Sequence, residues 1–585
     1  MKKTIDISRE EILHAIRRMP ILRCVACGCL LPVLAVTLHR VLPTWNGAEQ
    51  LLAYGTIGVA VVSCVLLWVV KRRVTFGWID TCVLLWFAYM TGRAWMGGDY
   101  PCASFGLKMV LAGFLYLSLR LLFSTRLVAG GMLSLLIIVM ACCEAYMGMD
   151  QLISGSSHHA RYLITGSFFN PGPYAAYLAI GIAVGCQWMC ELGDRKVARI
   201  KVSNLLLGAV LFCAVVLPAT WSRAAFVALA VCLAIIYWKY WRRYWVWMTL
   251  AVLIFSILFY LLKQGSADGR GFIFRMSALC VADHPLWGSG IGSFFHQYGE
   301  KVAQVCREGG FHDMASAEVI DYAFDDLMLV AVEQGLVGLS LVLGLLVMTA
   351  VALWRSSRPL FMGMLSMVLV SLFSYPFEML PYQILGVAMV AFAASQSAQG
   401  DGMSGGLILR PLTMTIVVAA GAAVTARAID ERYEANRDYE RVGNGGNDSY
   451  FNNLYYEILP LMNDNPRYLF AFGKMLRNQG RWNDSNDMLS RGAMLSNDPM
   501  FHVLMGENYV SLGDSTRAEQ TLWHACHMVP NRMYPLYCLA KLYEAQGENE
   551  KMKQTSRRLL KMDVKITSPA TREMQAYARK LLYSK

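Results

Sequence analysis

The sequence has little charge for its length. Charged residues make up 16% of the 585 positions and hydrophobic residues 56%, whereas an average soluble domain has about 25% charged residues. This composition excludes both one large soluble enzyme and a disordered chain, since disordered chains are poor in hydrophobic residues. The net charge of +12 does not indicate a nucleic-acid partner, because most Lys and Arg lie in short segments between apolar runs and are read there as determinants of membrane topology.

Several signatures of catalysis and metal binding are missing. The sequence contains no Gly-x-x-x-x-Gly-Lys phosphate loop, no zinc-finger spacing and no nucleophile elbow. The 16 Cys do not form a disulfide framework, because most lie inside apolar runs, where Cys acts as a small apolar residue. Cys24, Cys27 and Cys29 are closely spaced but lie in such a run and have no His partner. We therefore predict no metal site and no cofactor.

Apolar runs of about 20 residues recur along residues 1–428, and each is long enough to cross about 30 Å of hydrocarbon. They predict an all-α, polytopic membrane domain with about 12 or 13 spans. The runs lie near 21–40, 51–70, 75–92, 104–123, 127–148, 172–191, 203–221, 224–241, 244–263, 327–353, 359–376, 380–397 and 408–427. Residues 1–18 are too acidic for a signal peptide, so the first run is predicted to remain as an anchor.

Basic residues orient these spans. If the N-terminus is cytoplasmic, every second loop is rich in Lys and Arg, including a loop predicted to hold Arg120 and Arg126, as the positive-inside rule requires. The long segment 264–326 then lies outside the cytoplasm. An odd number of spans places the second predicted domain, 429–585, on the same outer side.

The segment 429–585 is polar and repetitive. Small residues recur at Gly473, Gly506 and Ala540, at intervals of 33 and 34, and a second series occupies the positions of the predicted turns: Gly480, Gly513 and Gly547. A helix pair repeated about every 34 residues resembles the tetratricopeptide repeat, which stacks into an α-solenoid with a concave binding surface. The segment is either a structural cap or a docking platform for a partner protein.

Four arginines on the predicted outer side are candidates for binding phosphate: Arg161, Arg223, Arg270 and Arg275. The positive-inside rule disfavours cations there, whereas a guanidinium group can grip phosphate through two parallel hydrogen bonds. The alternative is that they are ordinary surface arginines. The Gly-rich stretch 283–294 can present backbone N–H groups to an anion.

Other titratable residues on this side are His284, His296, His312 and Asp325. His284 is read first as a turn residue. Three charges inside the predicted spans, Asp80, Lys108 and Glu144, are read as helix-packing or snorkelling residues.

Four stretches resemble the O-antigen ligase and polymerase superfamily of bacterial envelopes. They are TGSFFNPGPYAAYL at 165–178, WSR at 221–223, GR at 269–270 with HPLWGSG at 284–290, and LMLVAVEQGLVG at 327–338. Their order and spacing are similar to those of the family over residues 150–400, and some members also carry a tetratricopeptide tail.

The resemblance implies an inverting, metal-independent glycosyltransferase of the bacterial inner membrane, with its repeat domain in the periplasm. The donor would be a glycan on undecaprenyl diphosphate, and the acceptor a hydroxyl of lipid A–core, another glycan or a protein. Arg223 and Arg270 would clamp the diphosphate. Arg161, Arg275, His284 and His296 would contribute to substrate binding.

One position departs from the family pattern. Ligases usually have a His nine residues before the Glu of the last motif, but here that position is Phe324 and Asp325 follows it. Asp325 can serve as the base instead, or it can be only a helix N-cap. His296 and His312 are alternative bases. The departure leaves lipopolysaccharide ligation, polymerisation and protein O-glycosylation open, beside a non-enzymatic scaffold or transporter.

Overall fold

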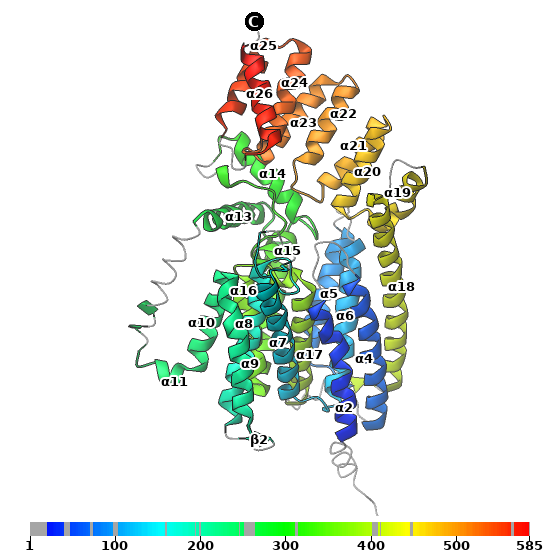
Figure 1. Cartoon of the computed structure of the whole chain (residues 1–585). Coiled ribbons are helices and arrows are strands. Elements are labelled where there is room, and N and C mark those ends of the chain that lie inside the picture. Colours follow the sequence, from blue (N-terminus) through cyan, green and yellow to red (C-terminus); the bar gives the residue numbers. More distant parts are fainter. Residues whose placement is uncertain are drawn as a thin grey trace, which may run out of the picture.

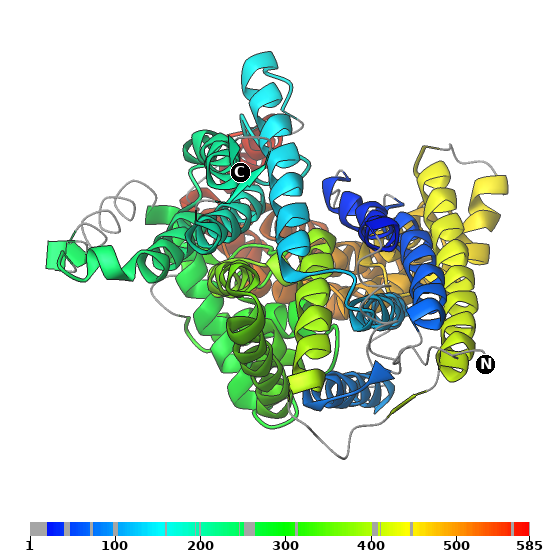
Figure 2. The same ribbon diagram turned by 90° about the horizontal axis from the view of Figure 1, so that it is seen from below.

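The structure is a computed structural model of the whole chain. It describes residues 20–583 except 40–46, 71–73, 97–102, 158–160, 194, 198–199, 245, 248, 251–263, 311–313, 401–407, 410, 445–448 and 563–566. A bundle of long helices carries a stack of shorter helices at one end, and we call this the outer end of the bundle (Figure 1). Figure 2 looks along the bundle from the opposite end.

The apolar runs that the structure describes form the bundle. Its helices are α2 (Pro20–Gly28), α3 (Leu30–Ala35), η1 (Val36–Leu38), α4 (Ala48–Val70), α5 (Trp78–Met96), α6 (Ala103–Ser124), α7 (Gly130–Ser154), α8 (Pro171–Leu192), α9 (Val202–Val216), η2 (Leu217–Thr220), α10 (Arg223–Ile236), α11 (Trp238–Trp241), α15 (Asp326–Ser356), α16 (Arg358–Ser371), η4 (Pro376–Glu378), α17 (Leu380–Gly400) and α18 (Pro411–Asn444). Helix α8 is buried along most of its length and packs against α7, α9, α10 and α16.

Eight described helices are long and apolar enough to cross a membrane, so the chain is a multi-pass, all-helical membrane protein. They correspond to eight of the predicted spans. The runs that become α10 and α16 form shorter apolar helices. Two others become α5 and α17, which are outside that group of eight. The predicted span 244–263 lies largely outside the described residues.

Two pairs of very short strands accompany the helices. β1 (Val74–Thr75) pairs with β4 (Ile408–Leu409), and β2 (Lys196–Val197) pairs with β3 (Ile200–Lys201), both antiparallel. They tie together the chain ends of neighbouring helices at the end opposite the repeats (Figure 1).

The segment 264–326 contains a small helical unit. It contains α13 (Gln264–Asp283), α14 (Phe294–Arg307) and η3 (Met314–Ser316). Its own apolar core includes Phe272, Met276, Phe294 and Tyr298, all almost fully buried. Figure 1 shows this unit between the bundle and the repeats.

The C-terminal part consists of paired helices, as the repeat pattern predicts. They are α19 (Ser449–Met462), α20 (Pro466–Asn478), α21 (Trp482–Ala493), α22 (Met500–Ser511), α23 (Ser515–Met528), α24 (Met533–Gln546), α25 (Asn549–Lys561) and α26 (Pro569–Tyr583). Gly480, Gly513 and Gly547 each have φ between +73° and +79° at the turn within a pair, a conformation that favours Gly.

The first series of small residues lies where paired helices touch. A Cβ atom on Gly473 would come within 2.7 Å of Leu489, and one on Gly506 within 2.7 Å of Leu522. Ala540 is fully buried. The spacing of 33 and 34 residues therefore reports a close approach of two helices, repeated in each pair.

The connection between the two parts is a continuous helix. Helix α18 runs from Pro411 to Asn444, across the boundary expected at 428/429. Just past that position, Asp430 accepts hydrogen bonds from Gln50 Nε2 (2.8 Å) and Tyr54 Oη (2.6 Å) of α4. The packing of α18 on α4 thus continues beyond the predicted boundary.

One basic residue that we placed in a loop is buried in the bundle. Arg120 is 1% exposed and lies within α6, where its Nε is 2.9 Å from Asp80 Oδ1. Tyr116 Oη also donates to Asp80 Oδ1 (2.7 Å). The prediction that Arg120 lies in a loop was wrong. Hydropathy alone does not reveal that Asp80 neutralises the charge of Arg120 inside the bundle. Asp80 does have the packing role that we predicted.

Candidate functional site: an arginine pair at the outer end

Arg223 is placed by a sharp turn between two helices. Helix η2 ends at Thr220, and Arg223 is the first residue of α10. Between them Trp221 has φ +50°, one of three positive φ values among the described non-glycine residues. Positive φ is costly for a bulky residue, and such strain clusters at functional sites. The turn leaves the Arg223 side chain partly exposed at the outer end.

Arg270 lies close to Arg223, although 46 positions separate them in the sequence. Its Nη1 donates to the carbonyl oxygen of Phe373 (2.8 Å), and its guanidinium carbon lies 5.2 Å from the ring centroid of Phe324. Burial, and then repulsion by the charge of Arg223, lower the pKa of Arg270. Neither guanidinium group pairs with a carboxylate in any described ion pair. Two such neighbouring cations favour the binding of an anion between them.

Aromatic rings lie next to Arg270. Tyr322 and Tyr375 stack with centroids 3.7 Å apart, and Phe324 meets Tyr375 edge to face at 5.4 Å. Phe169, from the 165–178 stretch, stacks on Tyr322 at 6.0 Å. Phe324 has φ +57°, so the residue that replaces the expected His sits in a strained backbone conformation and forms the floor beneath the Arg270 guanidinium.

Asp325 caps helix α15. Its Oδ1 accepts hydrogen bonds from the backbone N–H groups of Leu327 and Met328, both at 3.0 Å. Burial raises the pKa of this carboxyl, opposed only by those two cap hydrogen bonds. The geometry therefore supports the N-cap interpretation of Asp325.

The Gly-rich stretch after α13 docks onto a break in α15. Gly335 has φ +66° and ψ −169°, which interrupts that helix. The N–H groups of Ser289 and Gly290 donate to the carbonyls of Val332 (2.8 Å) and Glu333 (3.0 Å) exposed by the break. We expected these amides to be available to an anion, but they serve to fix the 264–326 unit to the bundle.

Replacing Gly335 by Ala should undo this docking. A Cβ atom there would lie 2.3 Å from the carbonyl oxygen of Leu286, and the backbone conformation of Gly335, which residues other than Gly rarely adopt, costs about 1–3 kcal/mol. We expect a lower Tm and faster proteolysis within 264–326. Gly344→Ala is the matched control in the same helix, since its Cβ would meet nothing within 4 Å. Equal Tm values for both variants would contradict the docking role.

The remaining predicted site residues lie in several different places. Arg275 is exposed; it follows Arg270 by five positions, about 140° around the helix. Arg161 is exposed on the 161–170 segment, and His284 is exposed in the turn after α13. His296 Nδ1 is 3.1 Å from the carbonyl oxygen of Ala493, so His296 faces the repeats. His312 lies outside the described residues.

Glu144 and Gln151 of α7 hold the 165–178 stretch in place. The Ser167 hydroxyl donates to Glu144 Oε1 (2.5 Å), and Gln151 Oε1 accepts from the N–H groups of Thr165 and Gly166, both at 2.8 Å. Glu144 is fully buried. The packing role predicted for this intramembrane charge is therefore the one observed, with Ser167 as its partner.

Glu378 is a buried carboxyl near Tyr375 that the sequence analysis did not single out. It ends η4, between α16 and α17 at the outer end, and burial, followed by repulsion from Glu333, raises its pKa to about 8. Its Oε1 has no hydrogen-bond partner among the described residues. Both Glu378 and Arg270 lie close enough to Tyr375 to affect that phenol electrostatically. Only the short apolar turn 375–380 surrounds Glu378 in the sequence, so no pattern singled it out.

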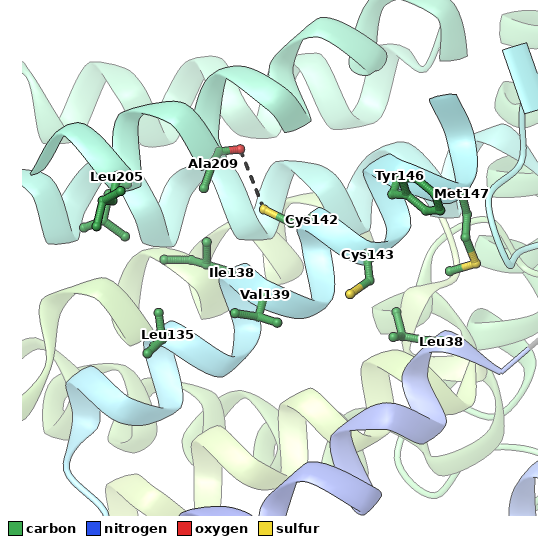
Figure 3. A pocket seen from close by; sticks show the side chains of 11 residues that line it. Leu38, Leu135, Ile138, Val139, Cys142, Cys143, Tyr146, Met147, Leu205 and Ala209 are labelled. Atoms are coloured by element: carbon green, nitrogen blue, oxygen red, sulfur yellow. Dashed lines mark hydrogen bonds between the residues drawn. The ribbon is translucent and has the colours of Figure 1, made fainter. Parts of the chain in front are cut away.

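A separate apolar cavity of about 550 Å³ opens between α7 and α9. Figure 3 shows its lining, which includes Ile138, Cys142, Tyr146 and Leu205; Cys142 Sγ points to the carbonyl oxygen of Ala209 at 3.9 Å. Its lining contains no charged side chain, so it suits hydrocarbon and not a phosphate group.

Similarity to individual known proteins is low. No curated protein matches the chain. Among solved structures, the crystal structure of MamA protein is 15% identical, with a TM-score of 0.22, and the match covers 26% of this chain and 88% of that one. The crystal structure of the APC/C hetero-tetramer Cut9–Hcn1 is 13% identical, with a TM-score of 0.22, and covers 91% and 89%. Such scores carry no conclusion.

The family comparison is more informative. Residues 208–343 match the family described as O-antigen ligase. The match begins in α9 and ends in α15, so it includes Arg223, Arg270, Asp325 and the docked Gly-rich stretch. The chain is therefore a multi-pass membrane protein whose segment 208–343 is similar to the O-antigen ligase family.

Proposed function

We propose that this protein transfers a glycan from undecaprenyl diphosphate to an acceptor hydroxyl at the outer end of the bundle. The observation that carries the proposal is the pair of guanidinium groups of Arg223 and Arg270, which approach each other closely enough for repulsion to lower the pKa of Arg270. A diphosphate between them would relieve this repulsion, and two planar forks of donors match its oxygens.

The same pair would assist the reaction. The bond between the anomeric carbon and the diphosphate oxygen breaks as the acceptor oxygen bonds to that carbon from the opposite face. Undecaprenyl diphosphate departs with the bonding electrons, and the acceptor proton passes to a base. Arg223 and Arg270 would stabilise the charge that develops on the departing diphosphate. The stacked Tyr322 and Tyr375 rings next to Arg270 would face the sugar.

We assign the proton-accepting role to Glu378 rather than to Asp325. One oxygen of Asp325 already accepts the two cap hydrogen bonds of α15, whereas Glu378 has an unpartnered oxygen and a pKa of about 8. General bases work best with a pKa near the operating pH. Asp325 would then position the start of α15 and the Phe324 ring beneath Arg270.

The pH dependence of transfer tests this assignment. Because ionised Glu378 is the active form, the rate should rise about tenfold per pH unit well below its pKa of about 8 and level off above it. Glu378→Gln should abolish this rise and lower the rate about 10²–10⁴-fold. Asp325→Asn, which keeps the cap, should transfer within a few-fold of wild type. A large loss in Asp325→Asn with Glu378→Gln active would reverse the assignment.

The same pKa shift predicts an effect on stability with a definite sign. The folded protein holds the Glu378 proton more tightly than the unfolded chain, whose pKa is near the ordinary 4.5. This contribution to stability is complete below pH 4.5 and is lost as the pH rises through about 8. The Tm of Glu378→Gln should therefore fall less between pH 5 and 8 than the Tm of wild type.

We also propose that the outer end faces the periplasm. The 264–326 unit and the repeats lie together at that end (Figure 1), opposite the basic hairpin β2–β3. Reporter fusions after Asp283 and after Lys585 should both give periplasmic signals. Comparison of lipopolysaccharide, capsule and glycoprotein profiles in a deletion strain would identify the acceptor, with loss of lipopolysaccharide ligation as the first expectation.

A further inference from the structure

Helix α14 of the 264–326 unit packs against helix α23 of the repeats, and a cluster of imidazole and carboxylate groups lies in this contact. Glu300 comes from α14, His502 from α22 and His524 from α23. One candidate ligand atom from each of the three residues lies within 4.8 Å of the other two. His524 Nε2 is 2.8 Å from Glu300 Oε1, and the His502 and His524 rings meet at 4.6 Å between centroids.

The three side chains are partly buried, and imidazole nitrogens together with a carboxylate oxygen are donor types that Zn²⁺ accepts.

We propose that Glu300, His502 and His524 bind one Zn²⁺ ion that clips the repeats to the 264–326 unit. Two imidazole nitrogens and one carboxylate oxygen form a common zinc ligand set, with bond lengths of 2.0–2.2 Å. A tetrahedral shell would separate the ligand atoms by about 3.4 Å, so modest side-chain rotations close the present spacing of up to 4.8 Å. Water would occupy the fourth position.

The clip would act at a distance from the transfer reaction. Helix α14 follows α13, which carries Arg270, and both share one apolar core. A metal ion between α14, α22 and α23 would fix that core to the repeats, and it would add to the existing contact of His296 with Ala493. This role is structural, so it is independent of the proposed metal-free transfer chemistry. The sequence gives no zinc spacing because the ligands come from positions 300, 502 and 524.

Metal analysis of the full-length, untagged protein tests the proposal. Detergent-purified protein is stripped with a chelator, dialysed against Zn²⁺ alone and measured for bound metal and Tm. We expect one Zn²⁺ per chain and a higher Tm in wild type. Glu300→Gln and His524→Asn should each weaken binding by more than the roughly tenfold cost of losing even an outer-shell partner, and should abolish the Tm increase.

His527→Asn is the matched control, since His527 lies on the same helix but stacks on Trp523 outside the cluster; it should bind Zn²⁺ like wild type. Co²⁺ titration of wild type adds a readout that needs no variant, because a tetrahedral site with two His ligands gives visible absorption bands that Zn²⁺ removes. Absence of stoichiometric Zn²⁺ in wild type, absence of these bands, or unchanged binding in both cluster variants would each overturn the proposal.

Discussion

Transfer should fall by at least about 10³-fold when Arg223 and Arg270 are both replaced by Ala. Each guanidinium is a preorganised donor aimed at a leaving group that gains charge, and removal of one such donor typically costs about 10²–10³-fold in kcat. Arg270→Ala should be the more harmful single change, because Arg270 is held in place over Phe324 and by the carbonyl oxygen of Phe373. Turnover of a lipid-linked glycan by purified protein measures these effects.

Three further variants show whether geometry or mere charge is responsible. Arg223→Lys keeps the charge but loses the planar fork, so we expect a substantial loss there as well. Arg161→Ala should lose less than Arg270→Ala, and so should Arg275→Ala, because both side chains are exposed. Wild-type turnover in the Arg223→Ala, Arg270→Ala double variant, at normal protein level, would remove the proposed mechanism.

The free energy of unfolding should fall by about 3–5 kcal/mol when Asp80 or Arg120 is replaced singly. The two side chains are 2% and 1% exposed and their nearest atoms are 2.9 Å apart, and breaking such a buried pair leaves one charge without its partner. Arg120 also donates to Ser124 Oγ and to the carbonyl of Thr75, both at 2.6 Å. Detergent-solubilised Asp80→Asn and Arg120→Met proteins should therefore unfold at a clearly lower temperature.

The double replacement separates pairing from packing. When both charges are removed, no uncompensated charge remains, so Asp80→Asn with Arg120→Met should cost less than the sum of the single changes. Arg427→Ala is a suitable reference, since Arg427 pairs with Glu431 on an exposed helix surface, where such pairs contribute about 0–1 kcal/mol. Strictly additive losses for Asp80 and Arg120 would contradict the coupling.

Features that depend on local pattern could be predicted from the sequence. The turn glycines Gly480, Gly513 and Gly547 all adopt the left-handed conformation that their spacing predicts. Arg223 and Arg270 stood out because basic residues are unexpected on the outer side, and the structure places them beside each other. The dual interpretation of Asp325 was also available from sequence, because Asp before an apolar helix is a strong N-cap.

Features that depend on tertiary contact could not be predicted from the sequence. Arg120 reads as a loop charge until Asp80 is seen 2.9 Å away. Ser289 and Gly290 read as anion donors until the break at Gly335 supplies their carbonyl partners. Glu378 carries no motif, and its raised pKa arises from burial and from Glu333, which is distant in sequence. In each case a long-range partner decides the role of the residue.

Direct binding of lipid to the purified protein tests the central claim, that Arg223 and Arg270 hold a diphosphate. Titration with undecaprenyl diphosphate and with the uncharged alcohol undecaprenol separates recognition of the head group from that of the hydrocarbon tail. The account predicts that wild type binds the diphosphate at least about 100-fold more tightly than the alcohol, as two charge-assisted donor groups permit, and that the Arg223→Ala, Arg270→Ala variant loses this preference while it still binds undecaprenol. Equal affinity of wild type for the two lipids, or an undiminished preference in the double variant, would contradict it.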